Sequence, residues 1–172
     1  MPPSSSPQVV PAAAQQPVAI SNLAAFLLGS WRIERTLLER STGQRGEFQG
    51  DLEFSSSHSG LHYRESGTLR WDAPQEVGSA PRDHRVPVKR DYLLRATPDP
   101  RVLDWYFDYG DYFHQLDLSS GRWQTEHPCS ADLYRVDYTV LDAEHLRVIW
   151  EVAGPHKDQL ISSSWSRLSA SP

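Results

Sequence analysis

Glu65 is the acidic residue whose position says most about chemistry, because its neighbours on the same strand face are mostly apolar or aromatic. In residues 61–71, the set containing Tyr63 and Glu65 alternates with a set of polar and charged side chains. Alternate strand residues point to opposite faces, so Tyr63 and Glu65 are expected to point inward. A buried carboxylate must be paired or protonated, since burying it unpaired costs several kcal/mol.

Arg35 is the expected counter-ion of Glu65, because it shares another predicted inward face with Trp31, Ile33 and Leu37. One interpretation is a buried Arg–Glu pair that is purely structural. The other is a ligand anchor, or a general base whose pKa is shifted by its surroundings.

His127 and Cys129 form a second candidate group, since residues two apart share a face of an extended chain. With His114 they would supply three ligands to zinc or iron, although no second clustered pair is present. With Asp132 as the orienting residue, they would form a Cys–His nucleophile. The third interpretation is a small thiol beside a hydrogen-bonded histidine, without chemistry. We therefore assign no metal and no cofactor from the sequence.

Histidine could also bind haem, as it does in some β-barrel proteins, and the candidates are His114, His127 and His156. The Gly-x-Trp-x-Gly-x-Gly opening expected of such a haem barrel is absent, because Trp31 is followed by Arg-Ile-Glu. Lys157 lies in the last turn, after Gly154-Pro155. It is interpreted either as a solvated partner of Asp158 or as a rim lysine that meets an anionic ligand.

The elements that position these residues are predicted to be short strands, because alternation of apolar and polar residues runs from Trp31 to the end of the chain. About ten strands separated by turn residues describe an up-and-down antiparallel meander, and a long meander tends to close into a barrel. The predicted strands are 31–40, 47–54, 61–71, 88–96, 102–109, 112–118, 122–126, 131–141, 145–152 and 159–168.

A short amphipathic helix is predicted at residues 21–29, with Ser21 as the N-cap and Gly29 as the terminating residue. Residues 1–20 are rich in Pro, Ser, Ala and Gln and are expected to form a disordered tail. Residues 21–172 are expected to form one β-barrel domain, and residues 72–87 a polar, mobile loop.

Composition and charge limit the kinds of molecule that the protein is expected to bind and the compartment in which it is expected. The net charge of −5, with Arg and Lys scattered among Asp and Glu, argues against a nucleic-acid-binding surface. No apolar run approaches the roughly 18–20 residues of a membrane span. The single cysteine excludes an internal disulfide, and the N-terminal segment lacks the basic and apolar regions of a signal peptide. A cytoplasmic protein is therefore expected.

Gly29-Ser30-Trp31 before the first strand, together with Arg167 in the last, resembles the lipocalin and wider calycin signature. In those barrels the tryptophan plugs the closed end and the arginine packs over its ring, a cation–π contact. A longer series of motifs is similar to the calycin-like family known as domain of unknown function 6314, over about residues 26–167. Its motifs include Gly46-x-Phe48-x-Gly50, Tyr63-x-Glu65-x-Gly67, His127-x-Cys129-x-x-Asp132-x-Tyr134 and Gly154-Pro155-x-Lys157-Asp158. The resemblance implies an all-β, calycin-like up-and-down barrel of about 8–10 strands with a short N-terminal helix, and no settled activity.

The main functional hypothesis is a barrel that binds one small-molecule ligand in a polar-lined internal cavity. The alternative is a cofactor-independent enzyme of isomerase, cyclase or hydrolase type that uses His and carboxylate groups. A third class is an accessory module beside a partner enzyme. The candidate ligand-binding residues are Arg35, Tyr63, Glu65, His114, His127, Cys129, Tyr134, Trp150 and Lys157.

Overall fold

The computed structural model of the chain describes residues 16–72 and 85–169. The expected tail lies outside the described residues up to position 15, and so does most of the expected loop, at positions 73–84. None of the helices in the described ranges is long and apolar enough to cross a membrane.

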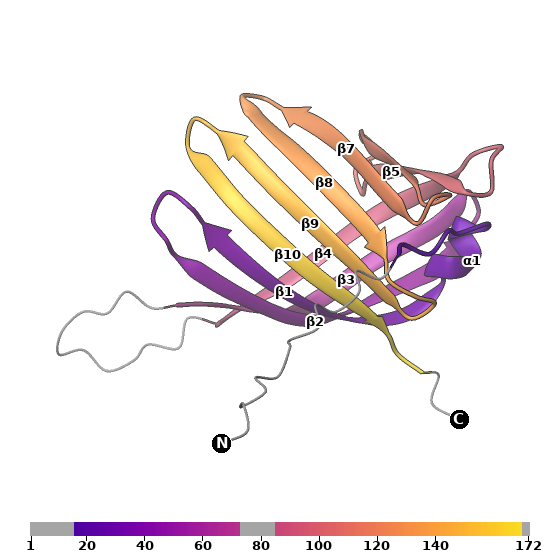
Figure 1. Cartoon of the computed structure of the whole chain (residues 1–172), viewed down its shortest axis with the longest axis horizontal. Coiled ribbons are helices and arrows are strands. Elements are labelled where there is room, and N and C mark those ends of the chain that lie inside the picture. Colours follow the sequence, from indigo (N-terminus) through magenta and orange to yellow (C-terminus); the bar gives the residue numbers. More distant parts are fainter. Residues whose placement is uncertain (1–15, 73–84, 170–172) are drawn as a thin grey trace, which may run out of the picture.

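The described residues form an all-β, up-and-down barrel of ten antiparallel strands with one short helix, α1 (Leu23–Leu27) (Figure 1). Strands that are neighbours in sequence pair with each other, except β6 and β7, and β1 also pairs with β10, giving the order β6-β5-β4-β3-β2-β1-β10-β9-β8-β7 among the described residues. The strands are β1 (Gly29–Glu39), β2 (Arg45–Ser57), β3 (Gly60–Trp71), β4 (Arg85–Ala96), β5 (Val102–Phe107), β6 (Tyr112–Asp117), β7 (Arg122–Cys129), β8 (Asp132–Val140), β9 (His145–Gly154) and β10 (Lys157–Arg167).

The barrel is nearly closed. Among the described residues, no backbone ladder joins β6 to β7, the two ends of the sheet. Side chains bridge this seam instead: the Trp123 indole Nε1 donates to the carbonyl oxygen of Gln115 at 2.8 Å. Pro128 lies in β7, at the sheet edge, where its missing N–H costs no ladder hydrogen bond.

One end of the barrel is plugged as the calycin resemblance implies. Trp31 is fully buried, its Nε1 donates to the carbonyl oxygen of Leu27 at 2.8 Å, and the Arg167 guanidinium lies 4.1 Å from its ring centroid. Arg167 also donates to the carbonyl oxygens of Phe26 and Leu28. The two motif residues thereby fix α1 across the closed end (Figure 1).

The prediction of a helix was right, but its capping was wrong. Asn22, one residue after the predicted cap, is the N-cap, and its side chain accepts from the amide of Ala25 at 3.0 Å. Gly29 does not end the helix; it begins β1 with a φ of 109°. The described part of the expected tail lies along the barrel, since the amides of Val18 and Ile20 donate to the carbonyl oxygens of Val140 and Leu118.

Candidate ligand-binding site

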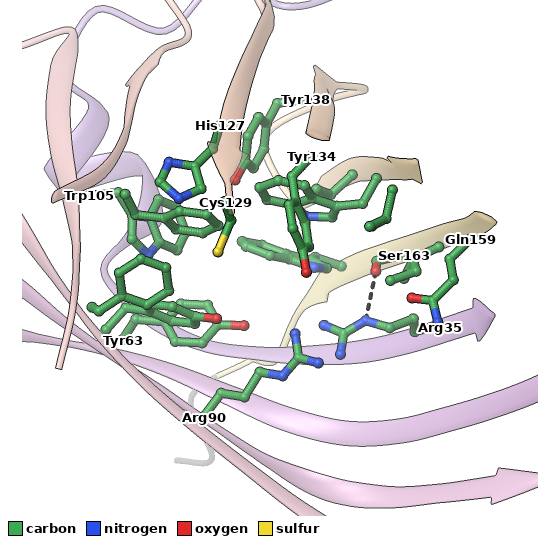
Figure 2. A pocket seen from close by; sticks show the side chains of 18 of the residues that line it. Arg35, Tyr63, Arg90, Trp105, His127, Cys129, Tyr134, Tyr138, Gln159 and Ser163 are labelled. Carbon is green, nitrogen blue, oxygen red and sulfur yellow. Dashed lines mark hydrogen bonds between the residues drawn. The ribbon is translucent and has the colours of Figure 1, made fainter. Parts of the chain in front are cut away.

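The other end of the barrel contains a pocket of about 430 Å³ (Figure 2). It is reached from the end that carries the β1–β2, β7–β8 and β9–β10 hairpins (Figure 1). The walls are mostly aromatic and aliphatic, with a few polar groups. The lining residues are Arg35, Tyr63, Arg90, Tyr92, Trp105, Phe107, Tyr109, Phe113, His127, Cys129, Tyr134, Tyr138, Val148, Trp150, Val152, Gln159, Ile161, Ser163 and Trp165.

Arg35 and Glu65 form the buried ion pair that the sequence predicted. The guanidinium Nη1 and Nη2 donate to Glu65 Oε1 and Oε2 at 2.8 and 2.7 Å, and Arg35 Nε donates to Ser163 Oγ at 2.9 Å. The Tyr63 hydroxyl also donates to Glu65 Oε2. The Glu65 side chain is 0% exposed and does not line the pocket, whereas Arg35 and Tyr63 do. Glu65 therefore orients the pocket-lining side chains of Arg35 and Tyr63 from a buried position outside the pocket.

The electrostatics of this group keep the carboxylate ionised. Burial alone would raise the pKa of Glu65, but the hydrogen bonds and charge of Arg35, with the bond from Tyr63, outweigh it and lower the pKa. Burial lowers the pKa of Arg35, and Glu65 more than reverses this, so its pKa is raised. Burial and the neighbouring carboxylate raise the pKa of Tyr63 well above its usual value, so its hydroxyl stays protonated.

A pair of glycines makes room beneath Arg35. Gly50 on β2 and Gly67 on β3 are register partners, and a Cβ on either would come within 2.6 Å of Cζ of Phe48. The Phe48 ring can therefore lie over both backbones, and the Arg35 guanidinium lies 4.8 Å from its centroid. The Gly-x-Phe-x-Gly and Tyr-x-Glu-x-Gly motifs thus form one packing unit, which holds the Arg35 guanidinium in place.

His114 is inward, as predicted, but it lies behind the lining residues. It is 2% exposed; its Nδ1 lies 2.9 Å from the carbonyl oxygen of Gln115, and its Nε2 lies 3.2 Å from the hydroxyl of Tyr138. Burial, with a small contribution from nearby His127, lowers the pKa of His114 to about 4. A neutral imidazole that donates from Nδ1 and accepts at Nε2 satisfies both contacts.

The strongest aromatic wall was not predicted. Phe113 and Trp150 are stacked with their centroids 5.4 Å apart and their planes at 3°, and Phe113 also packs on Phe107 at 4.6 Å. Along residues 112–118, strict alternation predicts that His114 points inward and Phe113 outward, but Phe113 lines the pocket. A register shift in the β5–β6 pairing, between Trp105 and Tyr106, breaks the alternation. Phe113 therefore turns into the pocket.

His127, Cys129, Tyr134 and Trp150 all line the pocket, so four of the predicted residues meet there with Arg35 and Tyr63. Figure 2 shows His127 and Cys129 on the side of Trp105, with Gln159 on the opposite side. Cys129 is exposed. Within the described ranges, no three His, Cys, Asp or Glu side chains are grouped so as to hold a metal ion.

Lys157 does not line the pocket. Its ammonium donates to Asp132 Oδ2 at 2.7 Å and to the Tyr134 hydroxyl at 3.1 Å, and these contacts raise its pKa. The partner is Asp132 on β8, which is separated from β10 by β9, rather than Asp158 as considered from the sequence. Lys157 thereby orients Tyr134, which does line the pocket.

Several lining residues were not selected from the sequence, and Arg90 is the one that carries charge. Alternation along β4 could have identified it, because Arg90 shares a strand face with Val88, Tyr92 and Leu94. Gln159 and Ser163 could have been found in the same way on β10. Two further lining residues, Trp105 and Trp165, have buried indole N–H groups that lack an acceptor among the described residues.

The closed barrel end, the Trp31–Arg167 contact and the open-ended pocket define a calycin-like barrel. Residues 27–167 match the model of the family of unknown function DUF6314, and the chain belongs to this family. A comparison with curated protein sequences finds no significant match.

Solved structures similar to the chain share its fold at low sequence identity. An S-type phycobiliprotein lyase from Guillardia theta matches with a TM-score of 0.61 and 9% identity, covering 90% of this chain and 95% of that one. A protein of unknown function of the DUF3598 family from Nostoc punctiforme matches with a TM-score of 0.54 and 11% identity, covering 94% of this chain but 53% of its own. A redesigned β-barrel bound to DFHBI matches with a TM-score of 0.42 and 15% identity, covering 86% of this chain and 100% of that one.

Proposed function

We propose that this protein is a small-molecule-binding barrel whose pocket holds one flat organic ligand. The observation that carries the proposal is the pocket of about 430 Å³ walled by aromatic rings, among them the stacked pair Phe113 and Trp150. Its volume lies within the roughly 300–1,000 Å³ of typical ligand sites. Ring faces aligned in this way favour a planar, conjugated guest that continues the stack.

Two of the candidate acid–base groups lie outside the pocket, which favours binding over catalysis by Glu65 or His114. Glu65 uses both carboxylate oxygens on Arg35 and Tyr63, and it lies behind the pocket wall. His114 is likewise behind the wall and held by Tyr138. A general base must reach the proton that it abstracts, so neither group is placed for that role. The similarity to the phycobiliprotein lyase is one of fold, and the proposal rests on the pocket.

The test is a fluorescence titration with N-phenyl-1-naphthylamine, a neutral flat dye that brightens in apolar surroundings. We expect one dye per chain, and we expect Trp150→Leu to weaken binding about ten-fold because it removes the stacking surface. Trp71→Leu is the matched control, since Trp71 is also half-buried but lies outside the pocket against Gly46. It should leave the affinity unchanged.

Two results would count against the proposal. One is the absence of saturable 1:1 binding by the folded protein. The other is equal weakening in the Trp150 and Trp71 variants, because the dye would then report a general loss of structure. Circular dichroism of both variants establishes that each remains folded.

A further inference from the structure

We propose that the ligand is an organic acid, and that Arg90 on β4 binds its anionic group while the aromatic wall holds its planar part. The inference rests on the proposed function, because it assigns the chemical class of the molecule in the same pocket. It is drawn from the charge balance of the lining residues.

The pocket carries one positive charge that the protein does not neutralise. Among the described residues that line it, two are arginines and none is acidic. Arg35 is matched by Glu65 directly behind it, at 2.7 Å, and its Nε is used on Ser163. The charge of Arg35 is therefore balanced, and that of Arg90 remains.

Arg90 has no carboxylate of its own within the described part of the chain. It is exposed, it is the register partner of Glu65, and its charge contributes to the lowered pKa of that carboxyl. Both Glu65 oxygens are nevertheless occupied by Arg35 and Tyr63, so Arg90 gains only a long-range attraction. Arg90, Arg35 and Glu65 together sum to one net positive charge.

The residues beside Arg90 cannot supply the missing anion. Asp91, the next residue, belongs to the opposite strand face and pairs with Arg64 and His62 outside the barrel. Figure 2 shows the guanidinium groups of Arg90 and Arg35 pointing into the same part of the pocket, beneath Tyr134. An anion arriving there would meet a guanidinium that is hydrogen-bonded to the Tyr92 side chain but is paired with no carboxylate among the described residues.

The experiment compares two dyes that differ mainly in charge. 8-Anilinonaphthalene-1-sulfonate carries a sulfonate on the same aromatic frame as neutral N-phenyl-1-naphthylamine. We expect the sulfonate dye to bind the unmodified protein more tightly, and Arg90→Gln to weaken it about ten-fold while changing neutral-dye affinity less than about two-fold. Lys89→Gln is the matched control, because it removes the same charge from the next residue, on the opposite face of β4.

The outcomes separate this inference from the proposed function. If the neutral dye binds at 1:1 but Arg90→Gln leaves the sulfonate dye unaffected, the acid anchor is wrong and the binding pocket stands. Equal weakening of the sulfonate dye by Arg90→Gln and Lys89→Gln would also overturn the anchor, since general surface charge would then account for it. If neither dye binds at 1:1, the proposed function itself fails. A salt titration adds a second readout, because Arg90→Gln should flatten the salt dependence of sulfonate-dye binding.

Discussion

Mild acid should destabilise this barrel through one buried imidazole, that of His114. The side chain is 2% exposed, and its pKa is lowered from 6.5 to about 4, mainly by burial. The unfolded chain therefore takes up a proton near pH 6.5, while the folded chain resists it until about pH 4. Stability is complete above pH 6.5 and is lost as the pH falls from there towards 4.

The size of the effect follows from the shift. Each pH unit inside this window costs up to about 1.4 kcal/mol, so moving from pH 7 to pH 4.5 should remove about 2.5 kcal/mol of unfolding free energy. His114→Gln is the reference variant, because a glutamine amide can donate towards the Gln115 carbonyl and accept from the Tyr138 hydroxyl without titrating. Urea unfolding followed by tryptophan fluorescence at several pH values measures both proteins.

The quantity to compare is the difference in unfolding free energy between the parent and His114→Gln. It should shrink by about 2.5 kcal/mol over that range. The carboxyl groups with lowered pKa values, such as Asp99 and Asp137, titrate from 3.8 or below and affect both proteins alike. Parallel pH profiles for the two proteins would refute the assignment of a buried neutral imidazole.

Two further predictions concern the group behind Arg35. Glu65→Gln leaves the buried guanidinium without its carboxylate and should lower the unfolding free energy, measured by urea unfolding, by about 3–5 kcal/mol. The double variant Arg35→Met/Glu65→Leu should regain most of that loss. A double variant whose loss equals the summed losses of Arg35→Met and Glu65→Leu would contradict this coupling. Gly67→Ala forces a methyl group against the backbone carbonyl oxygen of Gln49 and the Phe48 ring and should cost about 1–3 kcal/mol, while Ser66→Ala, on the exposed face of the same strand, should be nearly neutral in thermal unfolding. Equal melting temperatures for these two variants would exclude the packing of Phe48 over the glycines.

The strands and the faces of most of them followed from alternation alone. The period of two holds along β1 and β3, so the sequence alone predicts that Arg35 and Glu65 point inward and pair. The closed end followed from the resemblance to the calycin signature, and the structure makes Trp31 and Arg167 register partners at the start of β1 and the end of β10. Regular strands preserve their periodicity, and prediction succeeds where nothing interrupts it.

Prediction failed where position along the barrel axis or a local irregularity decided the outcome. Alternation distinguishes inside from outside, but not the packed half of the interior from the open half. His114 was therefore grouped with His127, although only His127 reaches the pocket. Phe113 was misplaced because the register shift beside Trp105 has no counterpart in residue composition. Arg90 was overlooked because one arginine among charged neighbours in Lys-Arg-Asp looks like ordinary surface.

The charge discrimination proposed for the pocket rests on the same local packing. Gly50 and Gly67 let Phe48 lie flat, Phe48 supports the Arg35 guanidinium, and Arg35 occupies both oxygens of Glu65. If Glu65 were free, it would offer Arg90 an internal partner and cancel the attraction for an acidic ligand. Under that proposal Glu65 acts from behind the pocket wall: because Arg35 and Tyr63 occupy both of its oxygens, Arg90 has no carboxylate partner among the described residues. Glu65→Gln, which leaves Arg35 unmatched as well, should accordingly strengthen the preference for the sulfonate dye in any fraction that folds, whereas loss of a ligand anchor would weaken it.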